Sequence, residues 1–302
     1  MSAALRLALL FLTGSLAAFL ATRAAPGDPA LLVLAEAGLG GEAAPALRAA
    51  FGTELPWLSQ YLRFLGGLLR GDLGLSFRTG LPVLPELLGR LPVSLGLSLG
   101  GLAVAALGAL PLGLAAAARP RGAADRGLGL ATLANQALPG FWLGSAALWL
   151  LSARLGAFSP LTGTAWERAV LPVALLAFAA LPPLAGAVRA AYREVASSRH
   201  LRAALARGEP VGAVLRRQGA PAARLALLAA ATGEAAFALG GAAVLEALLG
   251  LPGLGSWAVE AARARDWPVL QATILAAFLW ALAVQLAAGW LRVRLDPRLR
   301  AL

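Results

Sequence analysis

The pattern most suggestive of covalent chemistry is Gly96-Leu97-Ser98-Leu99-Gly100, which matches the G-x-S-x-G arrangement around a nucleophilic serine. Such a serine needs a base within hydrogen-bonding reach of its hydroxyl group. The chain has one histidine, His200, and the segments described below place it on the opposite side of a lipid bilayer from Ser98. The five residues are better explained as small side chains that let two helices pack closely. We therefore predict no catalytic residues.

The composition excludes several other kinds of site. The 302 residues include no cysteine, so thiol catalysis, disulfides and thiolate metal sites are ruled out. All 26 basic residues are arginine, so the chain lacks the lysine with which a P-loop holds nucleotide phosphates. With a single histidine as well, we expect no metal site and no cofactor bound by this chain.

The chain is far more apolar than a soluble protein. Apolar residues make up 59% of it, charged residues only 14%, and the mean hydropathy is +0.75. A helix needs about 20 residues to cross the hydrocarbon core, and backbone groups in lipid must be satisfied within helices. The sequence therefore predicts one all-α membrane domain over residues 1–302, a bundle of six transmembrane helices. The predicted spans are 3–22, 91–118, 127–153, 169–188, 225–245 and 267–291.

The distribution of arginine predicts the orientation of these spans. If the N-terminus is cytoplasmic, 16 arginines lie on the cytoplasmic side and 10 on the other side, six of them in the long outer segment 23–90. Basic residues are retained on the cytoplasmic side, so both termini are expected there. The net charge of +11 is then a sign of topology and not of nucleic-acid binding. The alternative is that the first span is a signal peptide with Arg6 in its basic region.

Polar residues and prolines interrupt three predicted spans. Pro139 and the pair Pro182-Pro183 should bend their helices, because proline removes a backbone hydrogen bond. Asn135 and Gln136 precede Pro139, and Glu234 lies inside the fifth span. Each either lines a translocation path or is satisfied within the bundle, and in an ion-coupled carrier Glu234 would be the ion site.

Glu246 stands near the outer end of the same predicted span as Glu234. We expect solvent to hydrate its carboxylate there.

The connection 189–224 is long, basic and patterned. Ser197 or Ser198 can cap a short helix that ends at Gly208, and Pro210 suits the start of another helix. Alanines permit close approach and arginines attract an acidic partner, so this helix could dock another protein. The alternative is a solvated loop that fixes topology or contacts anionic membrane lipid.

Several motifs together resemble the permease subunits of ABC importers, in the peptide/nickel branch. Residues 202–208 are similar to the EAA loop of that family, E-A-A-x-x-x-G, through Ala203, Ala204 and Gly208, while Arg202 departs from its first position. Ala226 or a neighbour also stands where the family often has proline. The other similar motifs are Pro26-Gly27-Asp28-Pro29-Ala30, Gly71-Asp72-Leu73-Gly74 with Ser76-Phe77, Glu246 with Leu251-Pro252-Gly253-Leu254-Gly255, and Leu295-Asp296-Pro297-Arg298.

The resemblance implies a type I importer permease fold in the inner membrane of a prokaryote, with no enzymatic activity of its own. Two permeases, of which this chain would be one, form the pathway for peptides or similar small solutes. Two separate ATPases bind and hydrolyse ATP, and an extracytoplasmic solute-binding protein delivers the substrate. In this family the EAA loop couples the permease to the ATPase, which gives that role to Arg202, Ala203, Ala204 and Gly208.

Overall fold

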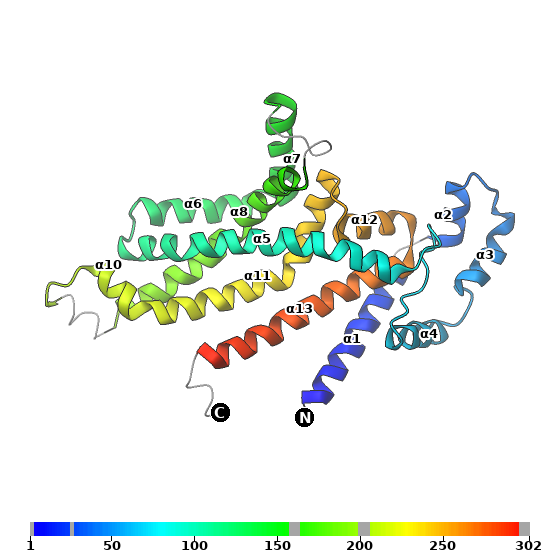
Figure 1. The fold of residues 1–302 in the computed structure, drawn as a ribbon, viewed down its shortest axis with the longest axis horizontal. Helices are drawn as coiled ribbons and strands as arrows, with labels where there is room; N and C mark the ends of the chain where they lie inside the picture. The colour runs from blue at the N-terminus through cyan, green and yellow to red at the C-terminus, as the bar shows by residue number, and fades with distance from the viewer. Residues whose placement is uncertain (1–2, 25–26, 157–163, 199–205, 296–302) are drawn as a thin grey trace. The chain divides into compact units, whose positions relative to one another are not determined.

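A computed structural model describes residues 3–24, 27–156, 164–198 and 206–295. All regular secondary structure in these ranges is helical, apart from one isolated bridge between Leu75 and Pro82. The first helices are α1 (Ala3–Ala24), α2 (Pro29–Glu36), η1 (Gly41–Ala43), α3 (Ala44–Phe51), α4 (Trp57–Leu69), α5 (Val83–Ala118), α6 (Ala123–Ala137), α7 (Gly140–Leu148) and η2 (Trp149–Arg154). After them come α8 (Ala165–Ala196), α10 (Val211–Val214), η3 (Leu215–Gly219), α11 (Ala220–Leu249), α12 (Leu254–Ala264) and α13 (Trp267–Leu295) (Figure 1).

Five helical segments in the described ranges are long and apolar enough to cross a membrane. They are Leu5–Arg23, Val83–Ala118, Glu167–Ala196, Gly212–Leu249 and Trp267–Arg294. Each contains most or all of one predicted span. The helices extend well beyond the bare spans at several ends, since α8 continues to Ala196 and α11 begins at Ala220, inside the predicted connection 189–224.

The remaining predicted span, 127–153, consists of shorter helical pieces. Leu138 is extended, with φ −107° and ψ 114°, and Pro139 precedes the first turn of α7. A residue before proline is pushed out of the helical region, so the sequence itself ends α6 here. Figure 1 shows a sharp change of direction between α6 and α7. The bend predicted at Pro139 is therefore a complete break.

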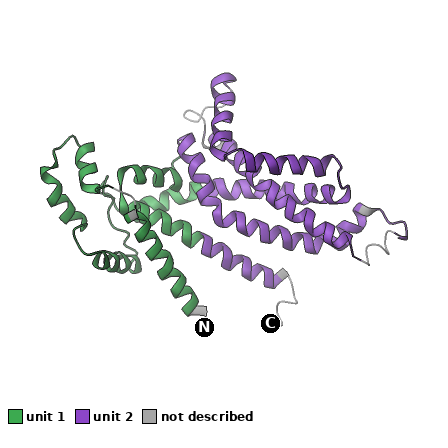
Figure 2. Cartoon of the chain, turned by 180° about the vertical axis from the view of Figure 1, so that it is seen from behind, with its two compact units in different colours: residues 1–94, 251–280 green, residues 95–250, 281–302 purple. Residues whose placement is uncertain are grey.

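The chain divides into two compact units, residues 1–94 with 251–280, and residues 95–250 with 281–302 (Figure 2). In the first unit, α5, α12 and α13 bury a core that includes Val83, Trp257 and Val269. In the second unit, two clusters join α5, α6, α8, η3 and α11.

Glycine lets α5 approach α8 closely within the second unit. A Cβ placed on Gly101 would lie 2.6 Å from Leu176 Cβ, and one on Gly113 would lie 2.5 Å from Val188 Cγ1. The motif that we interpreted as helix packing contributes through Gly100, whose Cβ would lie 3.4 Å from Val173 Cγ2, whereas a Cβ on Gly96 would meet open space. Close helix packing through small residues is typical of membrane proteins.

Candidate functional site: the connection between α8 and α11 and its supports

The predicted coupling residues fall partly outside the described chain. Arg202, Ala203 and Ala204 lie outside the described residues, as does His200. Gly208 is described, and its φ of +81° is the left-handed conformation expected of a glycine that ends a helix. Ala206 is helical, and a Cβ on Gly208 would meet nothing within 4 Å. The turn therefore needs glycine for its backbone and not for space.

Ion pairs surround this turn. Glu209 pairs with Arg207 and with Arg217, each at 2.9 Å between a guanidinium nitrogen and a carboxylate oxygen. The hydrogen bond from Arg207 is the main reason that the pKa of Glu209 is lowered. Pro210 then starts α10 by accepting hydrogen bonds from the backbone N–H groups of Ala213 and Val214. The start of a helix at Pro210 is thus confirmed, and Glu209 links it to the turn.

Of the two serines expected to cap the short helix, Ser197 lies at the end of α8, and the start of the short helix after Ser198 lies outside the described residues. Ser197 is the C-cap of α8, and its hydroxyl group donates to the carbonyl of Glu194 at 2.7 Å. Helix α8 is longer than the predicted apolar span 169–188 because its last turns pack on protein, as the burial of Val188 and Tyr192 shows.

The second part of the connection is packed firmly against α8. Leu215–Gly219 is a π-helix that leads into α11, and Pro221 cannot donate a backbone hydrogen bond to the Arg217 carbonyl, which interrupts regular α-helical pairing there. A Cβ on Gly219 would lie 2.6 Å from Tyr192 Cδ1. Tyr192, Val214 and Leu215 are almost fully buried together.

Asp125, in the first turn of α6, joins the C-terminal part of α8 to the loop between α5 and α6. Its carboxylate pairs with Arg189 and Arg193, both at 2.9 Å, and accepts the backbone N–H of Arg121 at 2.8 Å. The hydrogen bond from the Arg121 backbone, followed by those from the two arginine side chains, lowers the pKa of Asp125 to about 2. Because three donors converge on the Asp125 carboxylate, a displacement of α8 would be transmitted to α6.

The three residues considered for the translocation path are Asn135, Gln136 and Glu234. In the described ranges no hydrogen bond or ion pair joins them to one another. Asn135 Nδ2 donates to the carbonyl of Ala179 at 2.9 Å. Pro183 is the residue whose N–H would bond that carbonyl in a regular helix, so the Asn135 amide replaces a missing backbone donor. Gln136 is exposed, and Glu234 is half-buried on α11.

Two other polar residues of the spans have structural positions. Ser98 is buried, and its hydroxyl group donates to the Ala238 carbonyl at 3.0 Å. Glu246 is fully buried, so the expectation that solvent hydrates it was wrong. The reason is that α11 continues to Leu249 and ends at Gly250, whose φ is +64°, so that Glu246 faces protein in the last turn.

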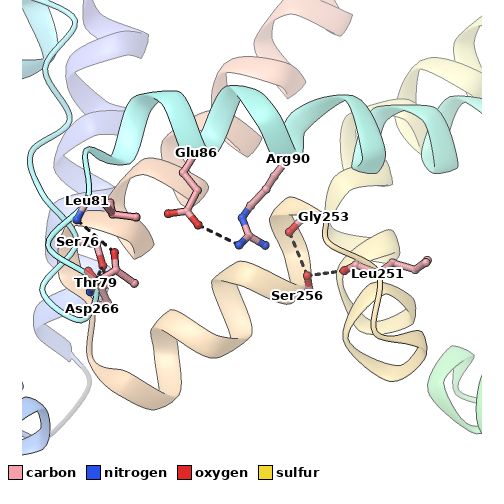
Figure 3. Close-up of polar contacts among 9 residues, drawn as sticks. All are labelled: Ser76, Thr79, Leu81, Glu86, Arg90, Leu251, Gly253, Ser256 and Asp266. Carbon is pink, nitrogen blue, oxygen red and sulfur yellow. Dashed lines mark hydrogen bonds and ion pairs between the residues drawn. The ribbon is translucent and has the colours of Figure 1, made fainter. Parts of the chain in front are cut away.

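The first unit contains a cluster of hydrogen bonds around Asp266, called the Asp266 latch below, that the sequence analysis did not predict. Asp266 accepts a hydrogen bond from Ser76 Oγ at 2.5 Å (Figure 3). It accepts another from the Phe77 backbone N–H at 3.1 Å. Thr79 N–H in turn donates to Ser76 Oγ at 3.0 Å. Asp266 also receives the Leu270 N–H on its carbonyl, so the latch holds the loop after α4 to the start of α13.

The motif 251–255 is also held by serines. Ser94 Oγ accepts the Leu254 N–H at 2.8 Å, and Ser256 Oγ donates to the carbonyls of Leu251 and Gly253 (Figure 3). Near it, Arg90 pairs with Glu86 at 3.0 Å and lies over the Trp257 ring at 5.2 Å. The family-like motifs are therefore structural supports in this unit.

Several long apolar helices in one chain are typical of a multi-pass membrane protein. The profile of the family "Binding-protein-dependent transport system inner membrane component" matches residues 109–301. The chain belongs to this family, and it is the inner-membrane permease component of an importer whose ATPase is a separate subunit. The family assignment favours binding-protein-dependent transport over the ion-coupled carrier.

Relatives match nearly the whole chain. A Brucella abortus protein named as a peptide transport system permease is 31% identical over 93% of this chain and 92% of its own length. The oligopeptide transport system permease protein AppB of Bacillus subtilis is 30% identical over 93% and 92% of the two chains. The dipeptide transport system permease protein DppB of Escherichia coli is 27% identical over 91% and 90%.

Proposed function

We propose that this chain is one of two permease subunits that form the pathway of a peptide importer. The substrate class rests on the names of its relatives, which transport peptides, oligopeptides or dipeptides. Its partners are a second permease, two ATP-binding cassette ATPases that bind the ATP, and an extracytoplasmic solute-binding protein. Both termini face the cytoplasm of a prokaryotic cell, and the six spans predicted from the sequence are surrounded by membrane lipid.

The observation that carries this proposal is the left-handed turn at Gly208 together with the contacts on its C-terminal side. Glu209 links Arg207 to Arg217, η3 packs on Tyr192, and Asp125 pairs with Arg189 and Arg193 of α8. A segment that docks another protein needs support from its own chain, and these contacts provide it. Arg202, Ala203, Ala204 and Gly208 are the residues that we assign to the contact with the ATPase.

Uptake measurements test this function and its alternative together. The chain is reconstituted with the second permease, ATPases and binding protein encoded beside it, and uptake of a labelled dipeptide is followed. We expect uptake that requires ATP, persists with a protonophore, and keeps its ATP requirement in the Glu234→Gln variant. Proton-driven uptake by the chain alone, abolished by Glu234→Gln, would contradict the proposal and establish the carrier.

A further inference from the structure

The first unit contains a cavity of about 490 Å³, the size of an ordinary small-molecule site. Its walls come from the end of α1, the end of α3, α4, the loop 72–80 and the start of α13. The Asp266 latch holds two of these walls together, because it joins Ser76 and Phe77 of the loop to the residue before α13. The cavity is therefore built from fixed elements.

Aromatic rings form much of its wall. Phe19, Phe51, Phe64, Phe77 and Trp267 all line it. Phe51 and Phe77 are stacked, with ring centroids 3.9 Å apart and an interplanar angle of 10°. Flat rings of this kind provide contact area for an apolar side chain with little loss of conformational freedom.

Three charged side chains line the same cavity, and no ion pair joins any of them to another group in the described ranges. Arg63 and Asp72 are exposed at its edge. Asp72 Oδ1 accepts the Gly74 N–H at 2.8 Å, which fixes the carboxylate without neutralising it. Two opposite charges at one cavity edge are complementary to a ligand that carries one charged group of each sign.

Arg23 provides the deeper cation. Its guanidinium lies 3.7 Å from the centroid of Trp267, and its Nη2 donates to Gln60 Oε1. Its Nε and Nη1 are buried and have no hydrogen-bond partner among the described residues. Buried donors without partners are unfavourable, so the cavity gains from an acceptor that enters it.

We infer that this cavity binds a short zwitterionic peptide with an apolar side chain. Arg63, with Arg23 behind it, receives the carboxylate, Asp72 receives the ammonium group, and the rings receive the side chain. A purely anionic headgroup would meet Asp72 as a like charge, and an uncharged ligand would leave all three charges unpaired. The inference deepens the proposed function and rests on it for the choice of a peptide.

Binding to the full chain in nanodiscs of neutral phosphatidylcholine tests the assignment. The probes are leucyl-phenylalanine, its C-terminal amide and its N-acetyl derivative, measured by calorimetry. We expect Arg63→Gln to weaken binding of the free acid by about tenfold and to leave the amide nearly unchanged, as for the loss of one charge-assisted hydrogen bond. Asp72→Asn, which keeps the acceptor for Gly74, should weaken the free amine and spare the N-acetyl peptide.

Arg70→Gln is the matched control, because Arg70 is an exposed arginine at the end of α4 that does not line the cavity. It should leave every affinity unchanged. Equal affinity of wild type for acid and amide, no saturable binding, or displacement of the dipeptide by phosphatidylglycerol overturns the inference. If ATP-driven peptide uptake occurs while the charge variants bind normally, the cavity assignment fails and the proposed function stands. If the dipeptide binds as expected and the complete importer takes up none, the peptide cargo of the proposed function fails instead.

Discussion

The bond between Asn135 and Ala179 allows a sharp test of how a proline is accommodated in α8. Pro183 has no N–H, so the donor that the structure gives the Ala179 carbonyl is the Asn135 amide at 2.9 Å. Side-chain hydrogen bonds between membrane helices contribute about 0.6 to 1.7 kcal/mol. Replacing Asn135 with leucine, which removes the donor without leaving a large void, should lower the free energy of unfolding by about 1 kcal/mol.

The Pro183→Ala background reveals whether that bond replaces a backbone donor. Alanine there restores the N–H that bonds the Ala179 carbonyl, so Asn135→Leu should lose less than half of its effect. The four proteins of this double-mutant cycle are compared by unfolding in mixed micelles with increasing sodium dodecyl sulfate. Gln136→Leu is the control, because Gln136 is exposed and neighbours Asn135. Equal losses in both backgrounds, or an equally large loss for Gln136→Leu, would refute the reasoning.

Three further predictions concern the connection 189–224 and the Asp125 carboxylate that pairs with it. Gly208→Val forces a β-branched residue to φ +81°, which costs about 1 to 2 kcal/mol, and it should uncouple ATP hydrolysis from uptake. The control Gly212→Ala, in a helix with open space beside it, should leave the two coupled. Normal uptake by the Gly208→Val variant would count against the coupling role. Gly219→Ala drives a methyl group into the Tyr192 ring and should lower the free energy of unfolding by about 1 to 3 kcal/mol, measured in the same micelle titration; an unchanged midpoint would show that the contact is loose. Asp125→Asn should lower the melting temperature at pH 7. Because the pKa of Asp125 is about 2 in the folded protein against an ordinary 3.8, the difference in melting temperature between wild type and variant should be complete above pH 3.8 and vanish as the pH falls towards 2. A difference that grows in acid would contradict this prediction.

The features that could be predicted from the sequence were those encoded locally. Apolar length predicted the long helices, Pro139 predicted an irregularity in the span 127–153 although not a complete break, and the pattern around Gly208 predicted the end of a helix there. These depend on residues within a few positions of each other. The family was also identifiable, since its motifs are short and lie in order along the chain.

The interactions that were missed connect distant parts of the chain. Ser76 and Asp266 are 190 positions apart, and Arg189 is 64 positions from Asp125. A single sequence gives no signal that such residues are partners. Asp266 could have been singled out only as an acid directly before an apolar helix, and the burial of Glu246 depended on where α11 ends.

The central claim is that the segment around Gly208 contacts a separate ATPase, and one introduced thiol can test it. The natural chain has no cysteine, so Ala206→Cys carries a unique reactive group in the last helical turn before Gly208. In membranes containing the assembled importer, a short photoactivatable crosslinker on that thiol should yield one adduct of permease and ATPase, lost when the ATPase is omitted. Labelling of the thiol by an impermeant reagent from the outer face, or crosslinks to every neighbour except the ATPase, would contradict the account.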